Sequence, residues 1–128
     1  MKGKKNGETN PNAFDTLVGK NAVFTGKLES SGLTRVEGQI NGDVILDGNL
    51  IVGQDSSVRG NIKAINVDVF GSVYGNIEVR SILTLHDTAK LVGDINVKSL
   101  IVKENATFEG RCSMKIGQTT EEKKHDKL

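Results

Sequence analysis

The chain has 128 residues and a formal net charge of +1, with 26% charged residues, 4% aromatic residues and no tryptophan. A chain of this length can bury one hydrophobic core, and its balanced charge argues against a nucleic-acid-binding protein. The single cysteine, Cys112, excludes an intramolecular disulfide.

Residues 1–12 are polar, with Lys2, Lys4 and Lys5 near the start and the chain's one proline at position 11. A segment with so few apolar residues cannot bury a core, so we expect a disordered tail. Three lysines would attract an anionic membrane surface by about 1 kcal/mol each. The sequence holds no run of 18 apolar residues and therefore predicts no membrane-spanning helix, so a cytoplasmic location is expected.

A five-residue phrase then recurs. Its order is an apolar residue, any residue, glycine, any residue and a second apolar residue. The glycines are at positions 26, 42, 60, 75, 93 and 110, in steps of 16, 18, 15, 18 and 17 residues. Recurrence at a nearly fixed period is typical of repeat proteins. Apolar and polar residues alternate within each repeat, which indicates strands that are buried on one face.

A period near 17, divided into three extended stretches, predicts an all-β, single-domain, three-sided parallel β-helix of about six rungs over residues 13–116. Equivalent residues of successive rungs would stack ~4.8 Å apart, so that six rungs make a rod of about 29 Å. Each rung would bury its inward residues against the rungs on either side. Two predicted inward columns are Leu50, Val67, Leu83 and Leu100, and Val52, Val69, Leu85 and Val102.

Residues 16–24 have the outline of residues 50–58 and predict a partial first rung. Residues 29–39 keep the length of a repeat but blur its pattern, as terminal repeats often do. Turn-forming Gly, Asn, Asp and Ser lie between the apolar columns, and proline is missing throughout, as expected where every rung donates main-chain hydrogen bonds. The periodicity stops at Lys115, and residues 117–128 are expected to be a second disordered tail.

Few residues could support catalysis. His86 falls at a corner, where we expect an exposed structural residue, and His125 falls in the tail. Cys112 takes the place that Ile95 has in the preceding rung and is expected to be a small buried hydrophobe. The sequence has no CxxC, no HExxH and no phosphate-binding loop. We therefore expect no catalytic residues, no cofactor, no bound metal and no enzyme activity.

The two ends of a β-helix are edges of unpaired backbone, which natural solenoids usually cover with a cap. Neither flank has a helical period or enough apolar residues to make one. Bulky apolar residues on an uncapped edge predict end-to-end assembly. A fold-back of the tails over the ends stays open as the alternative. The candidate interface residues are Phe108, Met114 and Ile116 in the last rung and Val18 and Phe24 in the first.

The outward positions carry charges of both signs, which is typical of a solvated face. Ile51 and Ile101 are outward apolar residues that occupy the same predicted column. Single exposed apolar residues are ordinary, but two in one column leave open a weak lateral contact strip.

The chain resembles the bactofilins, a family of bacterial cytoskeletal proteins. The resemblance spans about residues 13–114 and rests on the repeated Val-x-Gly-x-Ile phrases, the run VEGQINGDV at 36–44 and the closing ATFEG at 106–110. It implies a right-handed β-helix with a triangular core that assembles end to end, without nucleotide, into non-polar filaments. In the family a phenylalanine of the last rung belongs to the polymerisation contact, and Phe108 matches that place.

The resemblance also implies that the protein is its own main partner and is a scaffold for cell shape, cell-wall enzymes, polar structures or motility. Many members carry an apolar and basic membrane motif at the N-terminus. Residues 1–8 lack its bulky apolar part, so attachment to the inner face of the cell membrane stays open. No nucleic-acid partner is expected.

Two other functions stay open. Hexapeptide-repeat acyltransferases have a left-handed β-helix of similar period but need a catalytic histidine beside a protruding loop, for which the even spacing leaves no room. A monomeric adaptor that presents its β-helix faces to a cell-wall enzyme would require capped ends.

Overall fold

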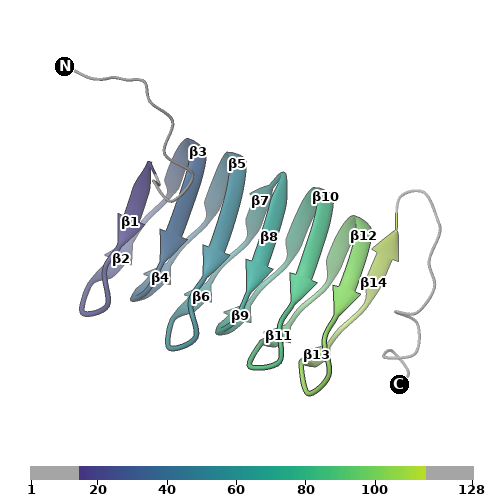
Figure 1. Ribbon diagram of the computed structural model, residues 1–128. Helices are drawn as coiled ribbons and strands as arrows, with labels where there is room; N and C mark the ends of the chain where they lie inside the picture. Colours follow the sequence, from purple (N-terminus) through teal and green to yellow (C-terminus); the bar gives the residue numbers. More distant parts are fainter. Residues whose placement is uncertain (1–14, 115–128) are drawn as a thin grey trace.

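The computed structural model describes residues 15–114, and within that range the chain forms strands and no helix (Figure 1). The predicted tails, residues 1–12 and 117–128, lie outside the described residues, as does Ile116. The strands are β1 (Thr16–Val18), β2 (Val23–Thr25), β3 (Leu28–Val36), β4 (Gln39–Asn41), β5 (Val44–Val52), β6 (Ser57–Arg59), β7 (Ile62–Ala64), β8 (Asn66–Val69), β9 (Ser72–Tyr74), β10 (Ile77–Leu85), β11 (Lys90–Val92), β12 (Ile95–Val102), β13 (Thr107–Glu109) and β14 (Cys112–Met114).

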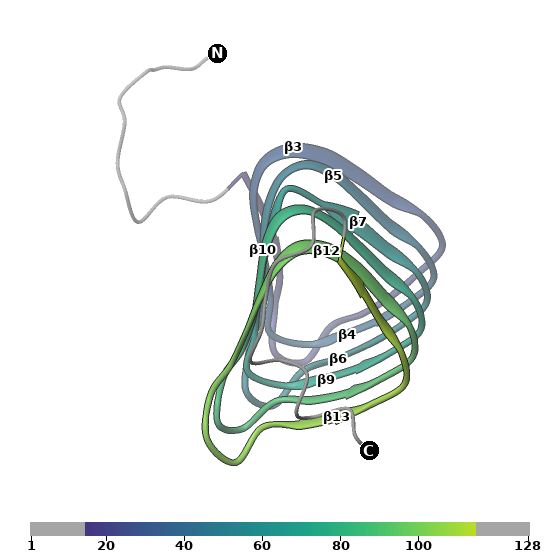
Figure 2. The same ribbon diagram turned by 90° about the vertical axis from the view of Figure 1, so that its right-hand side faces the viewer.

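The strands wind into a parallel solenoid whose rungs superimpose as triangles when viewed along the axis (Figure 2). We name the three sides by their residues. Face A comprises 23–25, 39–41, 57–59, 72–74, 90–92 and 107–109. Face B comprises 28–31, 44–47, 62–64, 77–80, 95–98 and 112–114, and face C comprises 16–18, 33–36, 49–52, 66–69, 82–85 and 99–102. Each face has six strands or half-strands, so the predicted parallel β-helix of about six rungs is confirmed.

Faces B and C are joined more closely than the three separate stretches of the prediction. Four long strands, β3, β5, β10 and β12, bend from face B to face C without a break. The ladder continues through the bend, since β3 pairs with β5 over all nine residues from Leu28 to Val36. A strand that keeps its hydrogen bonds while it bends needs no separate turn, although Ser31-Gly32 and Asp47-Gly48-Asn49 mark the bends of β3 and β5 in the sequence.

The core is a stack of aliphatic side chains in the predicted columns. The pairings place Leu50, Val67, Leu83 and Leu100 in one column. Leu50 and Leu83 are fully buried, and the buried residues of the described chain include no phenylalanine or tyrosine. The triangular interior is narrow, and Val, Ile and Leu side chains fill it without aromatic side chains.

The column continues through Thr34 to Thr16 in the first two rungs, where it is no longer apolar. Thr34 pairs with Leu50, so it occupies the inward position of its rung. It is 0% exposed, and its Oγ1 has no hydrogen-bond partner among the described atoms. This polar residue in a core position is the reason that residues 29–39 blur the repeat in the sequence, although they form the continuous strand β3.

The repeat steps vary because the corner between faces C and A has two or four residues, and because the rungs that contain β7 and β12 have one residue fewer where face B meets face C. Longer corners close with a turn in which a backbone N–H bonds to the carbonyl three residues earlier, as from Ser56 to Gly53 (3.1 Å) and from Ala89 to His86 (2.8 Å). The corner between faces A and B uses the phrase glycines instead. Gly60 has a φ of +153°, and a Cβ there would overlap the Gly42 carbonyl oxygen one rung below. Glycine is therefore required at this corner by both conformation and space.

Candidate assembly surfaces

The N-terminal edge of the solenoid consists of β1, β2 and the first half of β3. Val18 is 7% exposed, and Phe24 and Leu28 pack against the core while staying partly exposed. Asp15 tightens one point of this edge, because its N–H donates to the Leu33 carbonyl (2.7 Å) and its Oδ2 accepts the Leu33 N–H (3.1 Å). Elsewhere the edge strands have no earlier rung to pair with inside residues 15–114.

The C-terminal edge consists of β13, β14 and the second half of β12. β14 pairs with β12 only over Ile95–Val97, so residues 99–102 have no following strand in the described part of the chain. Leu100 is 8% exposed at this edge, whereas the fully covered Leu83 one rung earlier is 0% exposed. Further inward residues at this edge are only partly buried: Val102, Ala106, Phe108, Cys112 and Met114.

Phenylalanine occupies both ends of one inward column on face A. Phe24 pairs with Ile40 in the second rung, and Phe108 pairs with Leu91 in the fifth. The residues between them are aliphatic and fully buried. The largest side chains of the column therefore lie in the two terminal rungs, each of which has a neighbouring rung on one side only. Of the predicted interface residues, Val18, Phe24, Phe108 and Met114 lie on these edges.

A ladder of Asp and Asn side chains, which we call the Asx ladder, runs along the corner between faces A and B. Each Oδ1 accepts the backbone N–H of the equivalent residue in the next rung. The bonds run from Asn61 N to Asp43 (3.1 Å), Asn76 N to Asn61 (3.2 Å), Asp94 N to Asn76 (3.1 Å) and Arg111 N to Asp94 (3.2 Å). The ladder lines a groove together with outward residues of face B.

Sequence reasoning missed this ladder, although its signal is present. Every interior phrase glycine is followed by Asp or Asn, whereas the first is followed by Lys27 and the last by Arg111. Both terminal side chains have an acidic neighbour: Lys27 Nζ lies 3.2 Å from Glu29, and Arg111 Nη2 lies 4.0 Å from Asp94. The basic residues stand at the positions where the ladder begins and ends.

The candidate lateral residues Ile51 and Ile101 share the column that the sequence predicts. Two rungs separate them, because Ile51 pairs with Asp68, which pairs with Thr84, which pairs with Ile101. The side chains therefore form no continuous strip by themselves. Other large apolar residues also lie outward on face C, with Leu17 50% and Ile82 39% exposed.

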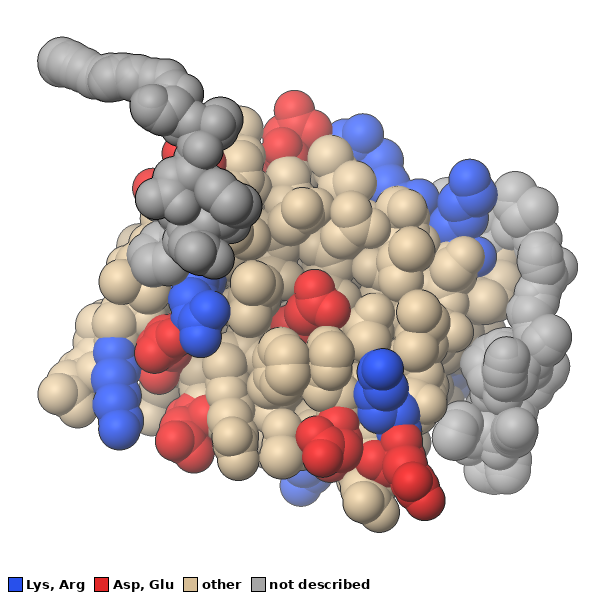
Figure 3. Space-filling model, in the orientation of Figure 1, with Lys and Arg blue, Asp and Glu red and all other residues tan. Residues whose placement is uncertain are grey.

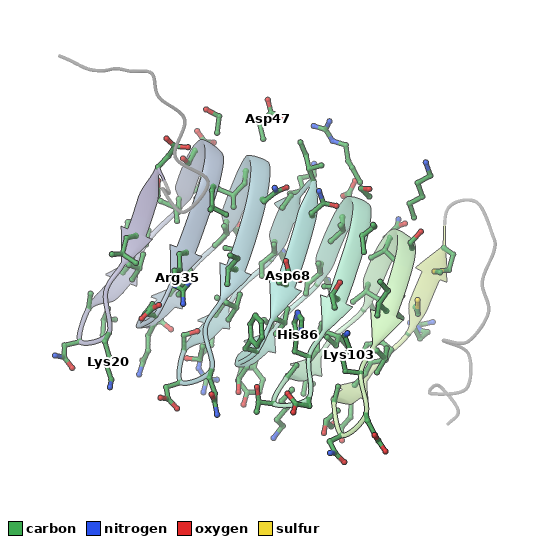
Figure 4. All side chains as sticks on the ribbon, viewed as in Figure 1. Lys20, Arg35, Asp47, Asp68, His86 and Lys103 are labelled. Carbon is green, nitrogen blue, oxygen red and sulfur yellow. The ribbon has the colours of Figure 1, made fainter. Side chains whose placement is uncertain are left out.

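His86 is less exposed than the sequence predicts. Its side chain is 23% exposed, its Nε2 lies 3.0 Å from Asp68 Oδ1, and its ring stacks on Phe70 with centroids 3.9 Å apart (Figure 4). The sequence did not reveal these partners because they lie one rung away. Within residues 15–114, no group of three or more His, Cys, Asp or Glu side chains could hold a metal ion, and no helix could span a membrane.

Comparison with known proteins agrees with this architecture. Residues 16–113 match the family model described as bactofilin, polymer-forming cytoskeletal. The chain is 32% identical to bactofilin BacP of Myxococcus xanthus over 103 residues, which cover 80% of this chain but only 43% of BacP. It is 27% identical to bactofilin BacO of the same organism over 100 residues, which are 78% of this chain and 79% of BacO.

A solved structure is also similar. It is the cryo-EM reconstruction of Thermus thermophilus bactofilin double helical filaments, with a TM-score of 0.72 and 26% sequence identity. The alignment covers 78% of this chain and 99% of that one. From the family match and the shared solenoid, we conclude that this chain belongs to the bactofilin family of polymer-forming cytoskeletal proteins.

Proposed function

We propose that this protein polymerises end to end, without nucleotide, into non-polar filaments that serve as a cytoplasmic scaffold. The observation that supports this most strongly is the pair of rung edges that no residue of 15–114 covers, each with open backbone and partly exposed core side chains. Edge strands of this kind pair readily with another chain. None of the described groups suggests a use for a nucleotide in that contact.

The contact would combine main-chain pairing with apolar burial. At the C-terminal edge, Phe108 and Met114 lie on neighbouring faces around the partly exposed Cys112, whose Sγ is 3.7 Å from Met114 Sδ. A second C-terminal edge would cover this rung as the previous rungs cover one another. Complete burial of a phenylalanine side chain contributes about 1.5–3 kcal/mol.

The ends of the Asx ladder favour a non-polar filament. If subunits stacked head to tail in continuous register, Lys27 of one subunit would lie over Arg111 of the next, at the ~4.8 Å rung spacing. Two positive charges at this distance repel each other, and neither side chain can continue the ladder of Asp and Asn acceptors. Two C-terminal edges, or two N-terminal edges, need not meet in this register. Such contacts therefore avoid the repulsion between Lys27 and Arg111.

The filaments of the Thermus thermophilus relative are double helical. We propose that the filaments of this protein likewise associate side by side, so that a scaffold of more than one strand forms. Such a scaffold would hold cell-wall or polar machinery in place near the inner face of the cell membrane. The chain itself is then the principal partner, and other proteins are clients that dock on the filament.

Sedimentation and negative-stain electron microscopy of the purified chain, in buffer without nucleotide, test this proposal. We expect protein in the high-speed pellet and filaments on the grid. A monodisperse monomer at high concentration would contradict the proposal and support the adaptor alternative. Turnover of an acyl-CoA by the unassembled protein would support the acyltransferase alternative.

A further inference from the structure

Face C differs from face B in its outward side chains. On face B, six of the outward positions are charged: Glu29, Asp47, Lys63, Glu78, Arg80 and Lys98. On face C of the described chain, Arg35 and Asp68 are the charged ones. Figure 3, which looks onto face C, shows mostly uncharged side chains, with one acidic group near the centre, a basic and an acidic group on the left, and further charged groups above and below.

Both charged side chains of face C have a hydrogen-bond partner within the subunit. Arg35 Nε forms an ion pair with the Glu37 carboxylate, and Asp68 Oδ1 lies 3.0 Å from His86 Nε2 (Figure 4). The stack of His86 on Phe70 keeps the imidazole at the side of the face. A second surface could therefore approach face C without meeting an isolated charge, whose burial would be unfavourable.

Exposed apolar side chains extend along the whole length of face C. Leu17 lies in the first rung, Ile51 in the third, and Ile82 and Ile101 in the fifth and sixth. Leu17 and Ile101, at the two ends, are 50% and 45% exposed. Because these residues reach both ends of the solenoid, end-to-end assembly would continue the apolar surface from one subunit to the next.

We propose that face C is the lateral contact of the filament, and that its partner is face C of a subunit in a second filament. This inference rests on the proposed end-to-end and side-by-side assembly and assigns the surface that carries the second step. Like faces suit each other here because each carries exposed apolar side chains and only two charged ones, both of which have a hydrogen-bond partner within the subunit.

The size of face C explains why lateral pairing would follow polymerisation. Six rungs span about 29 Å, and four strand residues span about 13 Å, so that one subunit offers roughly 400 Å². A stable complex usually buries about 800 Å² on each partner. Single subunits are therefore not expected to pair, whereas filaments repeat the contact and gain from multivalency.

The test compares two double variants that add the same charge at different faces. Ile51→Lys with Ile82→Lys places two lysines on face C away from the terminal rungs, and Gln39→Lys with Asn96→Lys places two on exposed positions of faces A and B. Filament width is measured by cryo-electron microscopy, and total polymer by high-speed sedimentation. We expect paired filaments for the wild type and the control variant, and single filaments with unchanged total polymer for the face C variant.

Each other outcome overturns the inference in a recognisable way. Wild-type protein without filaments would mean that the proposed function itself has failed. Wild-type filaments that stay single, or a face C variant that still pairs, would leave end-to-end assembly intact and refute the lateral assignment. Single wild-type filaments that bind vesicles of zwitterionic lipid, with loss of binding in the face C variant, would replace the second filament by a membrane surface.

Discussion

Phe24 and Phe108 occupy the first and last positions of the same inward column, with Ile40, Val58, Val73 and Leu91 between them. The four inner residues are fully buried, while the two phenylalanines are only partly buried. The column therefore ends on both sides with a large apolar surface that residues 15–114 of one chain do not cover. This arrangement is the structural basis for the assembly that we propose.

Phe108→Arg should abolish long filaments while leaving the solenoid folded. The loss of about 1.5–3 kcal/mol of burial corresponds to a roughly 10–150-fold weaker contact, and a buried unpaired guanidinium would weaken it further. Sedimentation across a concentration series measures this shift, and circular dichroism reports folding. Thr107→Arg is the matched control, because Thr107 is exposed on the same strand. Long filaments of Phe108→Arg at wild-type concentrations would refute the role of Phe108.

The size of the blocked species tests filament polarity. In a non-polar filament, Phe108→Arg breaks the contact between C-terminal edges and Phe24→Arg breaks the contact between N-terminal edges, so that each variant alone stops at a dimer. The expected mass by light scattering is twice the 13.8 kDa of the chain. In a polar filament every contact uses both ends. Each variant would then be a monomer, and a dimer would appear only after the two were mixed.

Thr34→Val should stabilise the protein by about 1–3 kcal/mol. The substitution keeps the shape of the side chain and removes a buried hydroxyl whose Oγ1 has no partner among the described residues. Urea denaturation of unassembled protein, in the Phe108→Arg background, measures the free energy of unfolding. Thr84→Val is the control, since Thr84 lies outward on face C and its hydroxyl is not fully buried. An unchanged or lower stability of Thr34→Val would show that this hydroxyl is satisfied in solution.

Asn76→Ala should destabilise the solenoid by about 0.5–1.5 kcal/mol. Asn76 Oδ1 accepts the Asp94 N–H at 3.1 Å, and alanine would leave this N–H without its protein partner. Asn76→Asp keeps the acceptor, as Asp43 and Asp94 do at equivalent positions, and should retain most of the stability. Thermal melting compares these variants with Asn96→Ala, an exposed change on face B. Equal losses of stability in Asn76→Ala and Asn96→Ala would show that the Asx ladder does not stabilise the solenoid.

Much of the fold can be predicted from the sequence because period and alternation act together. A step near 17 residues sets the rung, and alternation sets which residues point inward, so the column of Leu50, Val67, Leu83 and Leu100 follows from counting. Thr34 escapes this reasoning, since its rung is recognisable only through its pairing with Leu50.

Contacts between rungs were harder to predict than the rungs themselves. The stack of Phe70 on His86 joins residues of successive rungs, and a sequence search for local partners of His86 does not find it. The exposed residue Ile82 follows the bend between faces B and C, where the register between β10 and β12 shifts, so its outward direction was missed. The interface residues at the ends could be named, but a single chain does not show what they contact.

The axial subunit spacing of the filament tests the central claim most directly. Cryo-electron microscopy of nucleotide-free filaments measures both this spacing and the direction of the strands. End-to-end stacking of six rungs predicts a rise of about 29 Å per subunit and a meridional reflection near 4.8 Å, because the strands lie across the filament axis. A 4.8 Å reflection on the equator, with the solenoid axis across the filament, would contradict assembly through the terminal rungs.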